Sequence, residues 1–155
     1  MNEILQKPVV PVVFLPHGRG LPLPSYQSAG AAGMDLLAAI AEDEPVIIVP
    51  GKRVLIPTGI KMAIPYGFEG QVRPRSGLAI KYGITIPNAP GTIDSDYRGE
   101  ISVPIMNSGE EDFTVTRGMR IAQILFTPVI QVTLQQVEEL DDTSRGLSGF
   151  GSTGL

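Results

Sequence analysis

The sequence predicts an all-β domain with one short helix, on three observations. Its 155 residues contain 14 prolines and 18 glycines scattered from end to end, and proline interrupts almost every stretch that could form a long helix. The segments between these residues are short and rich in Val and Ile, which favours strands. Hydrophobic residues make up 43% of the chain, enough for one buried core. A β-sandwich, a jelly roll or a small barrel fits this pattern.

The expected strands follow one another along most of the chain. They cover residues 9–15, 46–49, 54–56, 84–86, 101–105, 113–116, 121–126 and 129–134. In the last of these, Ile130, Val132 and Leu134 alternate with polar residues, which is the period of two of a half-buried strand. No internal repeat or domain boundary interrupts this series.

One short helix is expected over residues 76–83. Ser76 is a residue type that caps helix N-termini, and Gly83 suits the position after the last turn. Arg73 and Arg75 come just before the helix. Because a helix N-terminus offers free N–H groups and partial positive charge, this arrangement predicts an anion site. The alternative is a capped surface helix whose arginines are solvated.

The composition limits the chemistry that the chain can perform. Without cysteine there is no disulfide, thiolate nucleophile or zinc–thiolate site. The one histidine, His17, lies between Pro16 and Gly18, where we expect a solvated side chain in a loop. Catalysis must therefore depend on carboxylates, a hydroxyl group or a bound metal ion.

Charge and hydropathy predict a cytoplasmic protein that binds neither nucleic acid nor a membrane. The formal net charge is −4, whereas a nucleic-acid backbone attracts a basic surface. The first residues lack the basic start and apolar run of a signal peptide. The uncharged run 121–137 contains four glutamines and Pro128, so it does not resemble a membrane span.

The glycine-rich tail, residues 145–154, is the first candidate for binding a ligand. It has four glycines in ten residues, together with Arg145 and Phe150. Gly N–H groups and an arginine suit phosphate oxygens, and a phenyl ring suits the face of a base. Ordering ten residues costs on the order of 10–20 kcal/mol. We expect a mobile lid over a nucleotide, with a disordered terminus as the alternative.

A second candidate site lies in residues 83–99. We expect a hairpin that exposes Asn88, whose amide can read the edge of a base. Asp94 and Asp96 lie two apart, so both would face one side of an extended chain. Either could position a metal ion or a water molecule. The alternative is a turn in which the aspartates cap their own backbone.

Three further polar residues stand among apolar neighbours. Asp35 needs a partner if it is buried, and either an arginine or a metal ion would serve. Arg120 is expected to form a structural ion pair. Gln123 offers one more amide to a ligand.

Taken in order, five segments resemble the five motifs of the trimeric dUTP pyrophosphatases (dUTPases). They are residues 29–39, 73–82, 91–99, 118–124 and 145–154. The matching strings are Ala-Gly-Met-Asp-Leu, Pro-Arg-Ser-Gly-Leu-Ala, Gly-Thr-Ile-Asp-Ser-Asp-Tyr-Arg-Gly, Arg-Ile-Ala-Gln and Arg-Gly-Leu-Ser-Gly-Phe-Gly-Ser-Thr-Gly. The resemblance covers nearly the whole chain after the first two dozen residues. The departures are Met34, where the family commonly has an aromatic residue, and Ser148, where it commonly has glycine.

The resemblance implies a β jelly-roll homotrimer with active sites at the subunit interfaces. Residues 1–144 would form the β domain, and residues 145–155 would form a flexible arm that closes over the active site. The implied reaction converts dUTP and water to dUMP and pyrophosphate with Mg²⁺ as cofactor. It lowers dUTP and supplies dUMP for thymidylate synthesis.

The family pattern also implies a role for each matching residue. Asp94, rather than Asp96, would be the general base, and Tyr97 would stack on deoxyribose and exclude a ribose 2′-OH. Asn88 would hydrogen-bond uracil. The phosphates would be bound by Arg75, Ser76, Gly77, Gln123 and Arg145, and the base would be covered by Phe150, with further substrate contacts from Thr92, Ile93 and Gly151. Asp35 would hold water molecules of the Mg²⁺ shell.

Three other functions compete with this interpretation. A dCTP deaminase shares the fold family and would release ammonia. A catalytically silent dUTP-binding regulator would bind the nucleotide without turnover. A β-sandwich interaction module would bind no nucleotide at all.

Overall fold

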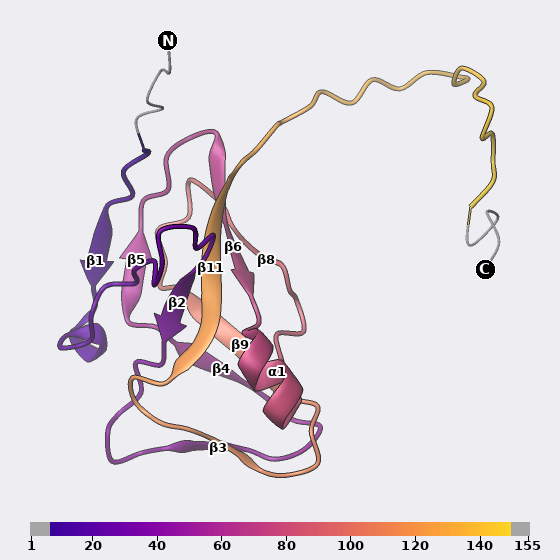
Figure 1. Ribbon diagram of the computed structural model, residues 1–155. Coiled ribbons are helices and arrows are strands. Elements are labelled where there is room, and N and C mark those ends of the chain that lie inside the picture. The colour runs from indigo at the N-terminus through magenta and orange to yellow at the C-terminus, as the bar shows by residue number, and fades with distance from the viewer. Residues whose placement is uncertain (1–6, 150–155) are drawn as a thin grey trace.

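The computed structural model describes residues 7–149, which form antiparallel strands, one α-helix and one short 3₁₀ helix (Figure 1). The elements in chain order are β1 (Val12–Phe14), η1 (Pro16–Gly18), β2 (Met34–Leu37), β3 (Val46–Ile48), β4 (Arg53–Pro57), β5 (Ile60–Met62), β6 (Phe68–Arg73), α1 (Ser76–Tyr82), β7 (Ile84–Thr85), β8 (Gly91–Ile93), β9 (Ser102–Asn107), β10 (Phe113–Val115) and β11 (Arg120–Pro128). No helix in this described part is long and apolar enough to cross a membrane.

Two larger sheets carry most of the structure. One has the strand order β2-β11-β6-β8 and the other β4-β9-β7, while β1 pairs with β5 and β3 with β10. All these pairs are antiparallel. Among residues 7–149 the strands do not close into a barrel. Of the three folds that the sequence allows, a jelly-roll-like arrangement is confirmed.

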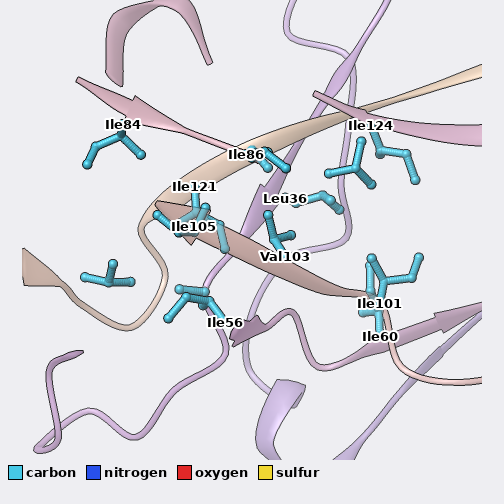
Figure 2. Packing of buried hydrophobic residues seen from close by; sticks show 14 of the residues in the cluster. Leu36, Ile56, Ile60, Ile84, Ile86, Ile101, Val103, Ile105, Ile121 and Ile124 are labelled. Carbon is cyan, nitrogen blue, oxygen red and sulfur yellow. The ribbon is translucent and has the colours of Figure 1, made fainter. Parts of the chain in front are cut away.

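The core contains aliphatic side chains contributed by both larger sheets. In β9, Val103 and Ile105 are fully buried and alternate with partly exposed Ser102 and Pro104. Figure 2 shows these side chains together with Leu36 of β2 and residues of other strands. Burying one such side chain contributes about 1.5–3 kcal/mol, so the alternation in β9 directs this strand into the core.

Seven of the expected strands coincide with or overlap observed ones, and β8 lies where the hairpin expected in residues 83–99 returns. The missed strands are β2, β5 and β6. In β6, Glu69, Gln71 and Arg73 alternate with Val72 and buried Gly70. A side chain at Gly70 would meet Ile64, Ile93 and Ile124 within 3.1–3.3 Å. Glycine fits here because the neighbouring isoleucines already fill this part of the core. Since Gly70 takes the place of an aliphatic residue, β6 lacks the apolar alternation that predicts a strand.

The strand expected over residues 129–134 is wrong. Strand β11 ends at Pro128, and after a hydrogen bond from Val129 N–H to the Gly67 carbonyl the chain leaves the sheets (Figure 1). Ile130, Val132 and Leu134 are 88%, 74% and 91% exposed. Their alternation has the period of a strand, but no strand of the described chain lies beside them to pair with it.

The N-cap residue of helix α1 lies one position earlier in the sequence than expected. Ser76 is its first residue, and Arg75 holds the N-cap position in an extended conformation without a side-chain capping bond. The expected end is confirmed: Gly83 has φ of 66°, and its N–H bonds to the carbonyls of Leu78 and Ala79. Glycine adopts this left-handed conformation without steric cost.

Asn107 connects β9 to its surroundings from inside the core. Its side chain is fully buried. Its Nδ2 donates to the carbonyls of Ile48 and Glu111, each at 2.7 Å, and its Oδ1 accepts from Gly109 N–H at 2.9 Å. One side chain therefore satisfies three buried or partly buried backbone groups.

We predict that Asn107→Ala lowers the free energy of unfolding by about 2–4 kcal/mol, because it leaves these groups without partners. Urea denaturation followed by circular dichroism measures the change. Thr114→Ala, on an exposed position of β10, is the control and should stay within about 0.5 kcal/mol of the unmodified chain. A loss no larger than that of the control would contradict the structural role of Asn107.

Candidate functional site

An ion-pair cluster lies where β2, β11 and the start of α1 meet. Arg75 Nε lies 2.9 Å from Asp35 Oδ1, and Arg120 Nη1 lies 3.7 Å from Asp35 Oδ2. Arg75 Nη1 also donates to the Arg120 carbonyl at 3.1 Å. The expected arginine partner of Asp35 and the expected structural ion pair of Arg120 are both confirmed. These contacts hold the Arg75 side chain in place at the N-terminus of helix α1.

Gln123 holds the connection between β6 and α1. It pairs in register with Asp35 on one side and with Arg73 on the other. Its Nε2 donates to the Pro74 carbonyl at 2.9 Å, and its Oε1 would lie 2.7 Å from a Cβ at Gly33. A side chain at Gly33 would push this amide away, so Gln123 positions the residue just before Arg75.

The start of α1 is open. Ser76 and Gly77 are exposed, and a Cβ built at Gly77 would meet nothing within 4 Å. Packing within the described chain therefore does not require glycine at this helical position, where it is less favourable than alanine by about 0.5–1 kcal/mol. Unpaired N–H groups next to Arg75 suit an oxyanion that approaches the backbone closely.

Asp94 follows the end of β8 directly. In β8, Thr92 is exposed and Ile93 half-buried, opposite Gln71 and Gly70 of β6. The Asp94 side chain is exposed and has no hydrogen bond or ion pair with any residue from 7 to 149. Its carboxylate oxygens are therefore available to accept a proton from water.

The extended geometry considered for Asp94 and Asp96 is wrong. Tyr97 N–H donates to the Asp94 carbonyl at 3.1 Å, and Ser95 and Asp96 form the turn between them. The backbone reverses here, so the two carboxylates do not share one side of a strand.

The expected hairpin around Asn88 is also wrong as a paired ladder. Strand β7 pairs with β9, whereas β8 pairs with β6. The segment between them is a turn, closed by a hydrogen bond from Ala89 N–H to the Ile86 carbonyl and followed by a cis Ala89–Pro90 bond. Asn88 is nevertheless exposed, as expected, and its Nδ2 would lie 3.2 Å from a Cβ at Gly91.

Tyr97 lies on the same turn as Asp94. Its side chain is partly exposed, and its hydroxyl donates to the Glu100 carbonyl at 2.9 Å. His17 is exposed, as expected, and its Nε2 also lies 2.5 Å from the Glu100 carboxylate. Glu100 was not among the predicted site residues. Its only signal was its place directly after the segment 91–99.

The two groups of site residues lie toward opposite ends of β6. Gln123 pairs with Arg73 at the end that leads into Arg75, while Ile93 pairs with Gly70 near the other end. The four residue steps of extended chain from Glu69 to Arg73 span about 13 Å. A hollow of about 580 Å³ borders Thr92 and Asp94, and another of about 830 Å³ borders Arg75 and Arg120. Neither hollow borders both groups, so one described chain does not bring them together.

The tail residues contribute little to this picture. Arg145 is exposed and donates from Nε to the Ser148 carbonyl at 3.0 Å within a local turn. The structure does not place it beside Arg75 or Asp94. Phe150 and Gly151 lie outside the described residues, and the roles and the boundary expected for the tail stay predictions.

Comparison with known proteins identifies the family. The family model described as dUTPase matches residues 19–154. The chain belongs to the dUTPase family.

Its dUTPase relatives are similar over nearly their whole length. A Mesorhizobium japonicum protein named deoxyuridine 5'-triphosphate nucleotidohydrolase is 60% identical, over 99% of this chain and 95% of its own. A Rhizobium rhizogenes protein with the same name is 56% identical, over 96% of each. The solved structure of a Staphylococcus bacteriophage 80alpha dUTPase mutant with dUpNHpp has a TM-score of 0.85 at 26% identity, over 96% of this chain and 100% of that chain. The resemblance read from the motifs is confirmed.

We predict that Gly83→Ala and Gly77→Ala change stability in opposite directions. At Gly83, φ is positive and a Cβ would lie 2.6 Å from the Gly109 backbone nitrogen, so alanine should lower the free energy of unfolding by about 1–3 kcal/mol. At Gly77 alanine meets nothing and should raise it by about 0.5–1 kcal/mol. Urea titration of both variants measures the difference, and equal effects would contradict this assignment.

Proposed function

We propose that this chain hydrolyses dUTP to dUMP and pyrophosphate at sites that three copies of the chain build together. Membership of the dUTPase family over residues 19–154 carries the proposal. The relatives named deoxyuridine 5'-triphosphate nucleotidohydrolase, at 55–60% identity, support the same reaction. The site residues support it too, because they supply a free carboxylate and a separate basic surface.

Asp94 is the general base in this proposal. Its carboxylate accepts a proton from a water molecule as that water attacks the α-phosphorus. The bond from the α-phosphorus to the bridging oxygen breaks, and pyrophosphate leaves with the electron pair. The exposed, unpaired state of Asp94 within residues 7–149 supports this role, since no arginine competes for its oxygens.

The start of α1 binds the phosphates. Arg75 brings positive charge, and the exposed backbone at Ser76 and Gly77 offers N–H donors to phosphate oxygens. Because Gly77 has no side chain, a phosphate group has room to approach the backbone closely at this position. Gln123 Nε2 donates to the Pro74 carbonyl and so positions the segment just before Arg75. Its Oε1 is left to accept a hydrogen bond from a group that is itself bound to the phosphates. Positioning and charge neutralisation account for most of the catalysis of phosphoryl transfer.

The residues fit a Mg²⁺ ion that is held chiefly by the substrate. Among the described residues, no three His, Cys, Asp or Glu side chains gather into a metal cage, and Mg²⁺ often takes most of its ligands from phosphates and water. Asp35 lies beside Arg75 and would reach such an ion through water. When bound, the ion would spread the negative charge of the triphosphate, while proton removal stays with Asp94.

The base and the sugar are recognised by the turns at each end of β8. The exposed Asn88 amide can donate to and accept from uracil. The Tyr97 ring packs against the deoxyribose, and Thr92 and Ile93 line the approach to it.

Assembly into a cyclic trimer would join the two halves of the site. Asp94 of one copy and Arg75 of the next would face one triphosphate, and the separation of the two residues along β6 supports this arrangement. The exposed apolar residues Ile130, Val132 and Leu134 would find cover on a neighbouring copy. The tail would then bring Arg145, Phe150 and Gly151 to a site on another subunit.

A substrate panel with Asp94 variants tests the reaction. Pyrophosphate release should occur with dUTP and be weak with UTP, dCTP and dTTP, and chelating Mg²⁺ should abolish it. Ammonia from dCTP would identify a deaminase, and dUTP binding without turnover a silent regulator.

We predict that Asp94→Asn lowers kcat by about 10²–10⁴-fold, because the general base is lost, while the Kd for dUTP stays within a few-fold. Asp96→Asn is the matched control, two residues away in the same turn, and should keep near-normal turnover. Near-normal release of pyrophosphate by Asp94→Asn would rule out its role.

Mixing two inactive variants tests the shared site. We predict that Asp94→Asn and Arg75→Ala chains, unfolded together and refolded in equal amounts, regain activity, since about a quarter of the sites of random trimers would combine two intact halves. The two variants refolded separately and then assayed together are the control. If the mixed sample is no more active than this control, both halves come from one chain.

A further inference from the structure

The Tyr97 side chain is connected to the N-terminal part of the chain through a short series of contacts, here called the Tyr97 link. The Tyr97 hydroxyl donates to the Glu100 carbonyl. The Glu100 carboxylate accepts from Gly59 N–H at 2.8 Å and lies 2.5 Å from His17 Nε2. Because a carboxylate only accepts, His17 Nε2 carries the proton. The link is thus His17–Glu100–Tyr97, with Gly59 as a second donor.

Two glycines allow the link to form. A Cβ at Gly18 would lie 2.3 Å from the Gly59 carbonyl oxygen, and a Cβ at Gly59 would lie 2.3 Å from the Gly18 Cα. The two backbones therefore touch, which places η1 directly against the β4–β5 turn. This contact brings His17 within reach of Glu100, 83 residues away in sequence.

The His17 end of the link is itself anchored. Arg117 donates to the carbonyls of His17 at 2.8 Å, Ile40 at 2.9 Å and Arg19 at 3.0 Å. One guanidinium therefore ties the backbone at His17 and Arg19 to the backbone at Ile40. His17 contacts Glu100 from a fixed support rather than from a freely moving loop.

A side chain at Gly99 would meet the tip of the Tyr97 ring. A Cβ at Gly99 would lie 2.3 Å from the Tyr97 hydroxyl oxygen and 2.5 Å from Cζ. The tip of the ring therefore lies against the Gly99 backbone, and its hydroxyl donates to the Glu100 carbonyl. These two contacts hold the tip of the ring, although the residue is 43% exposed.

We propose that Glu100, held by His17 and Gly59 N–H, is a positioning residue that fixes the Tyr97 ring and thereby sets how strongly the site prefers 2′-deoxyribose to ribose. The proposal rests on the proposed function, in which this ring packs on the sugar. Exclusion of one hydroxyl group by a ring requires that the ring cannot tilt away. If the link is broken, the ring tilts and ribose gains room, whereas deoxyribose already fits.

The discrimination between the two sugars measures the link. We predict that His17→Ala lowers the ratio of kcat/KM for dUTP to that for UTP by about tenfold. His17→Gln should restore the ratio to within about twofold, because the Gln amide keeps a donor at the place of Nε2. Glu100→Gln, which keeps the backbone carbonyl but makes the pair with His17 neutral, should give an intermediate ratio.

A matched control separates positioning from lost stability. The buried Thr58 hydroxyl donates to the Ile101 carbonyl beside the link but touches neither His17 nor Tyr97. Thr58→Val should lower the urea concentration at the midpoint of unfolding, because a buried hydrogen bond is lost, and leave the dUTP-to-UTP ratio unchanged. If His17→Ala reduces kcat/KM for both nucleotides by one common factor, as a purely structural loss would, the proposal is overturned.

A double-mutant cycle tests whether the effect passes through the Tyr97 hydroxyl. Tyr97→Phe keeps the ring but removes its bond to Glu100, so adding His17→Ala should then change the ratio by less than about twofold. Full additivity of the two changes would also overturn the link.

Binding without turnover keeps this test separate from the proposed reaction. The Kd ratio of dUMP to UMP, measured by calorimetry, reports sugar discrimination even in a chain that releases no pyrophosphate. An unmodified chain that prefers dUMP but does not hydrolyse dUTP would contradict only the reaction. A chain that hydrolyses dUTP, and whose ratios His17→Ala leaves unchanged, would contradict only the link.

Discussion

The pairing of β6 with β11 on one side and β8 on the other determines where every group of the site lies. The register brings Gln123 beside Arg73 at one end of β6 and Ile93 beside Gly70 toward the other. A slip of one residue would turn the buried face of β6 outward, and the aliphatic packing around Gly70 resists such a slip. Core packing and site geometry therefore depend on the same hydrogen-bonded ladder. Stability of the central sheet and placement of Asp94 and Arg75 cannot be varied independently.

Close backbone contacts, rather than side-chain bulk, bring the polar residues into position. Gly33 admits the Gln123 amide, Gly18 and Gly59 admit each other, and Gly99 admits the Tyr97 ring. In each case a Cβ would lie under 3 Å from its neighbour, so the absent side chain is the structural feature. Gly77 differs because nothing within the described chain fills its space. The other four glycines therefore serve packing within the chain, whereas the space beside Gly77 faces outward, next to the proposed phosphate site.

The sequence predicted most of the strands and the family, but not how the site is divided. Strands rich in Val and Ile were found because burial and propensity agree there. Strand β6 was missed because Gly70 occupies a buried position where an aliphatic residue would have given the pattern. The motifs assign Asp94, Arg75 and Gln123 to one site, yet spacing along a chain says nothing about which end of a strand each residue reaches. The contact between Glu100 and His17 was missed because it spans 83 residues and depends on the close approach of Gly18 and Gly59.

The segment beyond β11 links these points to assembly. Residues 130, 132 and 134 have the alternation of a strand, yet they are exposed in the chain. Burying three such side chains would contribute about 1.5–3 kcal/mol each, which is of the order needed to offset the ordering of a few residues. A neighbouring copy is the one surface that is always present at the same stoichiometry as this segment. The cyclic assembly proposed above would account both for a site whose halves lie apart on β6 and for an apolar segment that no other part of residues 7–149 covers. The alternation misread as a strand within the chain is then best understood as a pattern for contact between chains.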